Sequence, residues 1–410
     1  MEDIMYIQRD IEKTILKAVK QFPAITITGP RQSGKSTMLK KIFEKTHKYV
    51  TFDDPLVRER AISDPKLFFN SLGGKVILDE IQYVPQIVSY IKIAIDENRS
   101  YKGRFIITGS QQFHLIKNLG DSLAGRIAIF ELMPFCYNEM RRIKYLSKKL
   151  SSTENIFIHS CLNTSYPQPN TEVAININQW ISSYFQTYLE RDIKSIYDIG
   201  NLRDFQRFMQ LLAARCSQIL NLSTLASDLG ITVNTVKRWI SVLESSRIIY
   251  LLNPYYNNLG KRITKAPKVY FLDCGLVCYL TGISNKDVLL KGPLAGALFE
   301  NFCVQETVKQ LLNRQIRQGL YYIRTHNNLE VDLIIEKDME IYPCEIKMRM
   351  TPRMEDALNI IRLRETFNKL NIGTGRIISL NDETFVMKKN IFAVAFVEYI
   401  DWLGKKWGHT

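Results

Sequence analysis

The sequence has no apolar stretch long enough to cross a membrane. The longest candidate, KVYFLDCGLVCYLTG (268–282), contains Asp273 and falls short of the roughly 18 uninterrupted apolar residues that a spanning helix needs. The N-terminus, MEDIMYIQRD, is charged and lacks the apolar centre of a signal peptide. We therefore expect a cytoplasmic protein with no membrane partner.

The sequence also lacks the cysteine spacing of a zinc site. Its seven cysteines are odd in number, scattered, and never form a CxxC pair. The closest two, Cys274 and Cys278, have no second pair or histidine cluster nearby to complete a ligand set. Reduced, buried thiols are the expected state, as in most cytosolic proteins.

What the sequence does contain is an excess of basic side chains. The chain has 410 residues, enough for two or three domains, with 46% hydrophobic and 23% charged residues and a net charge of +14. Residues 141–290 hold 18 basic and 10 acidic side chains, so +8 of this excess lies in the middle third. Such an excess favours contact with polyanions, although soluble proteins with lysine-rich faces also show it.

The strongest motif is GPRQSGKST, which follows the apolar segment AITIT (24–28) and opens a helical segment. Its spacing, a glycine, four residues and then Gly-Lys-Ser, matches the phosphate-binding loop in its strand–loop–helix setting. The glycines let backbone N–H groups surround phosphates, Lys35 reaches the outer phosphates, and Ser36 ligates Mg²⁺. The predicted nucleotide-binding residues are Gly29, Pro30, Arg31, Gln32, Ser33, Gly34, Lys35, Ser36 and Thr37.

A second segment, KVILDEIQ (75–82), reads as a buried parallel strand that ends in two carboxylates. We expect Asp79 to hold the Mg²⁺ ion and Glu80 to polarise the attacking water, which predicts a nucleotide hydrolase. The alternative is a strand that merely ends in solvated acidic side chains.

Further groups for phosphate transfer follow along the chain. RFIITGS (104–110) predicts another strand, whose Thr108 and Ser110 could sense the outer phosphate or orient the water. Arg126 follows a glycine-containing turn, and a cation there would stabilise transition-state charge in its own chain's site or in a neighbour's. The alternative is an ordinary surface arginine.

The order of these motifs resembles a group of bacterial and archaeal AAA+-type ATPases. GPRQSGKST, YVTFDDP, VILDEIQ, FIITGS and SLAGR follow one another as in that family, and YLERDI and KAPKVYFLDCGL look like its later segments. The resemblance covers nearly the whole chain and implies a five-stranded parallel sheet with flanking helices and ATP as the nucleotide. It does not supply a cellular role, because most members of that family lack one.

The middle of the chain predicts helices. Residues 141–175 turn basic and then rich in Ser, Asn and Pro, which is typical of a lid or linker beside an ATPase core. Helical periodicity resumes in INQWISSYFQTYLERDIKSIYD (177–198).

LSTLASDLGITVNTVKRWISVLE (222–244) then predicts two helices joined by a turn at Gly230, with Thr232 capping the second. A strand pair follows, so the spacing is that of a winged helix-turn-helix. The sequence leaves open whether this winged helix contacts DNA or another protein. The exposed face of the second helix would carry Asn234, Thr235, Lys237, Arg238 and Ser241. The core would take Val233, Val236, Trp239, Ile240 and Leu243.

EVDLIIEKDMEIYPCEIK (330–347) reads as two strands joined by a polar turn. Preceded by a helix and a strand and followed by a helix, it has the order of a restriction-endonuclease-like core. In that arrangement Asp332 and Glu345 would bind Mg²⁺, Lys347 would position the water, and Glu300 would support the metal. The alternatives are a hairpin with a charged solvent face, or a nuclease-like domain that binds without cutting.

The sequence therefore predicts an α/β protein whose parts follow one another along the chain. The predicted function is Mg²⁺-dependent ATP hydrolysis coupled to DNA or to a DNA-associated partner, with the oligomeric state open between a monomer and a homo-oligomer. One alternative is an ATP-dependent nuclease in defence or mobile-element biology. Another is a nucleotide-gated signalling or scaffold protein that never contacts nucleic acid. The predicted parts are an AAA+-type ATPase core (1–140), a helical lid or linker (141–200), a winged helix (201–280) and a nuclease-like domain (281–410).

Overall fold

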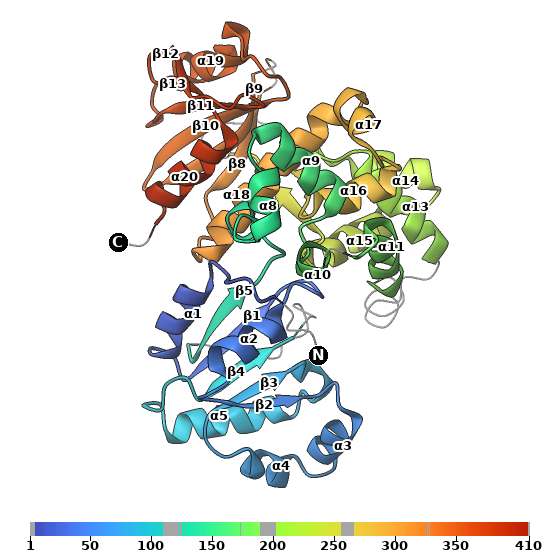
Figure 1. The fold of residues 1–410 in the computed structure, drawn as a ribbon, viewed down its shortest axis with the longest axis vertical. Coiled ribbons are helices and arrows are strands. Elements are labelled where there is room, and N and C mark those ends of the chain that lie inside the picture. The colour runs from blue at the N-terminus through green and yellow to red at the C-terminus, as the bar shows by residue number, and fades with distance from the viewer. Residues whose placement is uncertain are drawn as a thin grey trace.

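The computed structural model describes residues 5–109, 123, 125–172, 174–188, 202–255, 266–325, 327 and 329–408. The N-terminal sheet and its helices form one end of the molecule, and the C-terminal sheet forms the other (Figure 1). The mainly helical middle of the chain lies between these two ends and extends to one side of the molecule (Figure 1). Among the described residues, no helix has the length and apolar character that crossing a membrane requires.

The N-terminal sheet has, within the described residues, five parallel strands in the order β2-β3-β4-β1-β5. This confirms the predicted five-stranded parallel sheet. The carboxyl ends of all five strands lie at one edge, where the predicted nucleotide residues begin. The strands are β1 (Ala24–Thr28), β2 (Lys48–Thr51), β3 (Val76–Asp79), β4 (Phe105–Thr108) and β5 (Ile127–Glu131).

Helices cover both faces of this sheet, which is why β1, β3 and β4 are mostly apolar and are buried along their whole length. One face packs against α1 and α2 through side chains such as Ile15 and Leu39. The other face packs against α3, α4 and α5 through side chains such as Phe68 and Ile91. The helices are α1 (Glu12–Val19), α2 (Lys35–Phe43), α3 (Pro55–Ser63), α4 (Pro65–Leu72), the 3-10 turn η1 (Ile81–Tyr83) and α5 (Ile87–Glu97).

Within its described residues, the middle of the chain is helical, as expected, apart from one short antiparallel pair of strands, β6 (Ile249–Leu252) and β7 (Lys268–Phe271). A strand pair was expected after residue 244, and β6 supplies its first strand, whereas the partner strand β7 comes later in the chain. The helices before this pair are α7 (Tyr137–Met140), α8 (Lys144–Lys149), α9 (Thr153–Asn163), α10 (Pro167–Thr171), α11 (Ile177–Tyr188), α13 (Leu202–Ala213), α14 (Leu222–Leu229) and α15 (Val233–Ser245). Those after it are α16 (Cys274–Thr281) and α17 (Lys286–Lys291).

The two helices predicted around Gly230 are present. Gly230 has φ +69° and ends α14, and the Thr232 hydroxyl accepts a hydrogen bond from Thr235 N at 3.1 Å, as an N-cap does. The expectation that Val233 faces the core is wrong, because it lies in the first turn of α15 and is 42% exposed. The other four predicted core residues of α15 are buried, and Lys237 and Arg238 are exposed.

The C-terminal sheet is mixed, with the order β12-β13-β11-β10-β9-β8 over the described part of the chain. Strands β8, β9 and β10 are antiparallel neighbours, whereas β11 runs parallel to β10. The predicted order of helix, strand, hairpin and helix is therefore present. Its elements are α18 (Ala295–Asn313), β8 (Leu320–Arg324), β9 (Glu330–Lys337), β10 (Glu340–Lys347), η3 (Met354–Ala357), α19 (Leu358–Thr366), β11 (Gly375–Ser379), β12 (Phe385–Lys388), β13 (Ile391–Val394) and α20 (Phe396–Lys406).

Helix α18 joins the middle segments to the C-terminal sheet. Several of its polar side chains are buried and hydrogen-bonded. Asn301 bonds both the N–H and the carbonyl of Phe271, and Glu306 accepts from Tyr137 N at 2.8 Å. One apolar core extends from the middle helices through α18 to α20. The domain limits at 140, 200 and 280 stay a prediction.

Candidate active site

The phosphate-binding motif forms the loop between β1 and α2, with two glycines in conformations that suit only glycine. Gly29 has φ +139°, and a Cβ there would lie 2.1 Å from the carbonyl oxygen of Leu132. Gly34 has φ +92° and lies directly before the first residue of α2. The loop therefore runs tightly against the end of β5 and leads into the N-terminus of α2, the end of a helix that favours a bound anion.

Lys35 is buried within this loop. Its ammonium group donates to the carbonyl oxygens of Gly29 and Pro30 at 2.9 and 2.8 Å. The loop thus holds the charged end of the side chain beside the place where the outer phosphates of a nucleotide would lie.

Arg9 belongs to none of the sequence motifs, yet its side chain contacts the phosphate loop. Its guanidinium donates to Ser33 O at 2.7 Å and to Met133 O at 2.6 Å, and its Nε lies 3.1 Å from the Glu139 carboxylate. The side chain is almost fully buried. It ties the phosphate loop to the segment after β5, so we regard Arg9 as a positioning residue for the loop.

Ser36 and Asp79 meet at the carboxyl edge of the sheet, as the sequence predicts. The Ser36 hydroxyl lies 3.1 and 3.0 Å from the two Asp79 oxygens, and Tyr49 and Thr108 also donate to that carboxylate. Hydroxyl and carboxylate oxygens are the hard ligands that Mg²⁺ prefers. These two side chains therefore fit the predicted magnesium site.

Glu80 follows Asp79 in a left-handed conformation, with φ +57°. Gln82 donates to its carboxylate, and Thr108 Oγ1 accepts from Glu80 N at 3.4 Å. Such a backbone position is uncommon for a residue other than glycine, and functional sites are among the places where it clusters. Ser110, the other predicted polar group of this segment, lies outside the described residues.

A cavity of about 380 Å³ opens over the loop, and we name it the phosphate cavity. Lys35, Ser36 and Glu80 line it from the sheet side, whereas Tyr184 and Tyr188 line it from α11. The helix α11 belongs to the middle segment, so the chain after the sheet folds back over the nucleotide residues.

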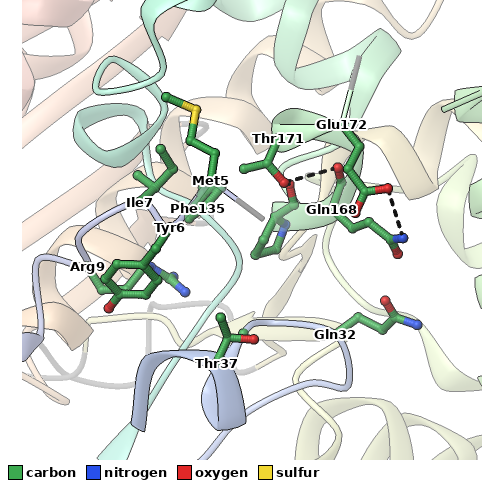
Figure 2. A pocket seen from close by; sticks show the side chains of 12 residues that line it. Met5, Tyr6, Ile7, Arg9, Gln32, Thr37, Phe135, Gln168, Thr171 and Glu172 are labelled. Atoms are coloured by element: carbon green, nitrogen blue, oxygen red, sulfur yellow. Dashed lines mark hydrogen bonds between the residues drawn. The ribbon is translucent and has the colours of Figure 1, made fainter. Parts of the chain in front are cut away.

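A second cavity, of about 250 Å³, adjoins the first and shares Gln32, Gly34 and Thr37 with it. We name it the apolar cavity, since Met5, Ile7 and Phe135 line one side. Figure 2 shows these side chains across from Gln168 of α10 and Glu172, which follows that helix, with the phosphate loop below. Gln168 is held in place by Trp180 Nε1, which donates to its Oε1 at 3.1 Å.

Arg126 does not reach this site within one chain. Its guanidinium forms a two-point ion pair with Asp96 of α5, at 2.8 and 3.1 Å. The next residue, Ile127, pairs with Ala24 at the start of β1, whereas the phosphate loop follows Thr28 at the end of that strand. Four residues of extended strand therefore separate the level of Ile127 from the start of the phosphate loop, which is a distance of roughly 13 Å.

The C-terminal hairpin brings its predicted residues together. Lys347 Nζ lies 3.1 Å from Asp332 and 2.5 Å from Glu345, and Ile346 N donates to Asp332 at 2.9 Å. Burial raises the pKa of Glu345 well above its usual range. Burial opposes ionisation of Asp332 too, but Lys268 and Lys347 hold its pKa below the usual range.

Glu300 joins this group through a cation that the sequence reading missed. Lys268 Nζ lies 3.1 Å from Glu300, 2.9 Å from Glu330 and 3.9 Å from Asp332, and its side chain is 4% exposed. Burial raises the pKa of Glu300 to about 7. Only the fold could reveal Lys268, since it lies 32 residues before Glu300 and 62 before Glu330, and it belongs to a different sheet from Glu330.

These side chains form a network of ion pairs, and the metal site that they were expected to form stays a prediction. Among the described residues, just one group of three metal-ligating side chains has donor atoms within 4.8 Å of one another, and it is Asp10, Cys136 and Glu139. Asp10 and Glu139 are already paired with Arg142 and Arg9. An ammonium group, that of Lys268, lies between the carboxylates of Glu300 and Asp332.

Comparison with known proteins adds a family for one part of the chain. Residues 21–141 match the family described as AAA domain. Residues 156–287 and 295–399 match two families that are each described as a domain of unknown function.

Relatives extend over most of the chain but are uncharacterized. A protein of Mycobacterium tuberculosis is 27% identical over 389 residues, which are 94% of this chain and 83% of that protein. One of Methanocaldococcus jannaschii is 24% identical over 409 residues, covering 92% and 86%.

Among solved structures, a Walker-type ATPase of Pyrococcus abyssi is 12% identical, with a TM-score of 0.45, over 68% of this chain and 97% of that one. The RuvB Holliday junction branch migration motor of Thermotoga maritima is 14% identical, with a TM-score of 0.32, over 60% and 89%. Both TM-scores are too low for an inference about this chain. The family match and the five-stranded parallel sheet agree with the resemblance that the motifs suggested: residues 21–141 form a P-loop domain of the AAA type.

Proposed function

We propose that the protein hydrolyses ATP in the phosphate cavity. The observation that carries this proposal is the contact between the Ser36 hydroxyl and the Asp79 carboxylate. Glu80 follows Asp79 and lines the same cavity as Ser36. Ser36 and Asp79 would hold the Mg²⁺ ion, which neutralises phosphate charge when bound. Lys35 would bind the outer phosphates, and Glu80 would accept a proton from the attacking water.

The two cavities suit the two halves of a nucleotide. The phosphate cavity holds the polar groups Lys35, Ser36 and Glu80, whereas apolar side chains such as Ile7 and Phe135 wall the apolar cavity. Because a purine base needs apolar walls and a few polar groups, we place the base in the apolar cavity. The segment before α1 and the helix α10 would then close around the nucleoside.

We further propose that ATP turnover is coupled to DNA or to a DNA-associated partner in the cytoplasm, through the exposed face of α15. Lys237 and Arg238 are exposed on that helix, and no ion pair involves either of them among the described residues. Free cations on a helix of this kind suit phosphate groups of a nucleic acid.

The experiment is ATP turnover measured with and without DNA at several salt concentrations. The proposal predicts stimulation by DNA that weakens as salt rises. A Lys237→Ala/Arg238→Ala variant should keep its basal turnover and lose the stimulation, whereas Lys148→Ala/Lys149→Ala, an exposed pair on α8, should keep both. ATP turnover that ignores DNA would favour a nucleotide-gated scaffold that binds no nucleic acid.

A second candidate function is metal-dependent cleavage of nucleic acid by the C-terminal part. It is favoured by the gathering of Asp332, Glu345 and Lys347, with Glu300 linked to them through Lys268. The same network favours a domain that binds without cutting, because Lys268 already supplies the positive charge that a metal would bring. We propose binding without cleavage as the function of this part.

A further inference from the structure

We propose that the protein has a second phosphate-binding site, separate from the phosphate loop, in a cavity of about 470 Å³ near the N-terminal helix. We name it the basic cavity. Its walls come from α1 and the segment before it, from α7, and from the carboxyl ends of α18 and α20. The residues that line it include Arg9, Asp10, Lys13, Lys17, Arg142 and Arg314.

This cavity carries an excess of positive charge. Five of its lining side chains are cationic, and Asp10 is the one acidic side chain among them. Arg9 is paired with Glu139 and Arg142 with Asp10, so Lys13, Lys17 and Arg314 supply the excess. Lys13 and Lys17 are exposed, lie four residues apart on α1, and have no ion-pair partner among the described residues. Like charges at this spacing repel each other, and an anion bound between them would relieve that repulsion.

Arg314 is held in place through one nitrogen of its guanidinium. Arg314 Nη1 donates to the carbonyl and side-chain oxygens of Gln310, at 2.7 and 2.9 Å. Its Nη2 lies 3.2 Å from where a Cβ of Gly404 would be, so this glycine leaves room beside the guanidinium. A guanidinium held in this way binds phosphate oxygens with little further loss of side-chain freedom.

Two amide side chains, Asn138 and Asn313, complete the set of possible donors in the cavity. Compact groups of arginine, lysine and amide donors are the chemistry that recognises phosphate. The phosphate could belong to a small phosphorylated molecule or to the backbone of a nucleic acid, and both sources share this chemistry.

The basic cavity is next to the nucleotide site yet distinct from it. Arg9 lines both the basic cavity and the apolar cavity, and it donates to Ser33 O of the phosphate loop. No other residue lines both, and none of the loop residues 29–37 lines the basic cavity. The proposal therefore does not depend on ATP hydrolysis.

The test uses the full chain with its phosphate loop filled by a non-hydrolysable ATP analogue and Mg²⁺. Inorganic tripolyphosphate is then titrated by calorimetry. Two variants change the free cations, Lys13→Glu/Lys17→Glu and the milder Lys13→Gln/Lys17→Gln. The matched control is Lys41→Glu/Lys45→Glu, a pair that is also exposed and four residues apart but lies outside the cavity.

We expect wild-type protein to bind tripolyphosphate at this second site. Affinity should fall by about tenfold or more in both Lys13/Lys17 variants, as loss of charge-assisted hydrogen bonds predicts, and stay unchanged in the control. Competition by a labelled oligonucleotide, with the same loss in the variants, would assign the phosphate to nucleic acid. Its failure to compete would assign a small phosphorylated ligand. Absence of binding to the wild type, or an equal loss in the control, would overturn the proposal.

Discussion

Arg247 holds Glu131 at two points, with its Nε and Nη2 at 2.7 and 2.9 Å from the two carboxylate oxygens. Glu131 ends β5 opposite Thr28, the last residue before the phosphate loop, and is 2% exposed. Arg247 lies between α15 and β6, and Arg317, which follows α18, is 3.6 Å from the same carboxylate. The buried carboxylate of Glu131 thus joins the N-terminal sheet to the segment after α15, through Arg247, and to the segment after α18, through Arg317.

Removal of this arginine should therefore destabilise the whole chain. In Arg247→Met, Glu131 stays buried with only the longer contact to Arg317, and we expect a loss of about 3 kcal/mol in the free energy of unfolding. The double variant Glu131→Gln/Arg247→Met should lose less than the sum of the two single variants. Urea unfolding measures all three, and additive losses would show that the pair does not interact.

The hydrolytic assignment predicts different failures for two site residues. Lys35→Ala should lose nucleotide binding or turnover, because the outer phosphates lose their cation. Glu80→Gln should retain ATP binding yet stop hydrolysis, since an amide cannot act as a base. Nucleotide titration and phosphate release distinguish these results, and normal turnover in both variants would sink the assignment.

Arg126 lies at the amino ends of the strands, whereas the phosphate loop lies at their carboxyl ends. A catalytic role for Arg126 therefore requires the site of a neighbouring chain. In that case Arg126→Ala should lower turnover with little loss of ATP affinity, and mixing it with Glu80→Gln protein should restore some activity. Asp96→Asn, which frees Arg126 from its ion pair, is the matched control and should keep turnover. Absence of rescue at every mixing ratio would leave Arg126 as a surface ion-pair residue.

The C-terminal network predicts no cleavage of DNA or RNA by wild-type protein with Mg²⁺ or Mn²⁺. Lys347→Ala should only weaken nucleic-acid binding modestly and leave ATP turnover unchanged. Lys268→Met removes the ammonium group beside Glu300, Glu330 and Asp332, so we expect a lower melting temperature that Mn²⁺ partly restores. Metal-dependent cleavage that disappears in Lys347→Ala would establish a nuclease instead.

His159 predicts a pH dependence of stability. Burial lowers its pKa from 6.5, and its Nε2 lies 2.8 Å from the Oδ1 of Asn170 in α10. Below about pH 6.5 the unfolded chain therefore binds a proton at this side chain that the folded chain does not bind. The free energy of unfolding should fall as the pH is lowered through this range. The slope from one such group approaches about 1.4 kcal/mol per pH unit.

His159→Gln should flatten part of this dependence in urea unfolding between pH 7 and pH 5. His47, whose pKa is also lowered by burial, provides the comparison, and His47→Gln should remove a separate and additive part. An unchanged slope in His159→Gln would mean that His159 becomes protonated within the fold.

Local sequence was sufficient for the nucleotide motifs because each depends on neighbours along the chain. The glycine spacing of residues 29–37 sets the loop between β1 and α2, and an apolar strand that ends in Asp79 places that carboxylate at the same sheet edge as Ser36. Likewise Gly230 and Thr232 end and begin the helices that they were expected to bound. Helix caps, tight loops and parallel strand edges follow from backbone geometry that a few residues specify.

Tertiary structure alone decided which distant charges meet. Nothing in the sequence pairs Arg9 with Ser33, Arg247 with Glu131, or Lys268 with Glu300, since each pair is joined by the packing of separate elements. A buried charge is stable only where the fold supplies its partner, so these positions are specified by three-dimensional packing and leave no local pattern. The placing of Ser36 and Asp79 beside the phosphate loop could thus be predicted from the sequence, whereas the support of that loop and its links to the rest of the chain could not.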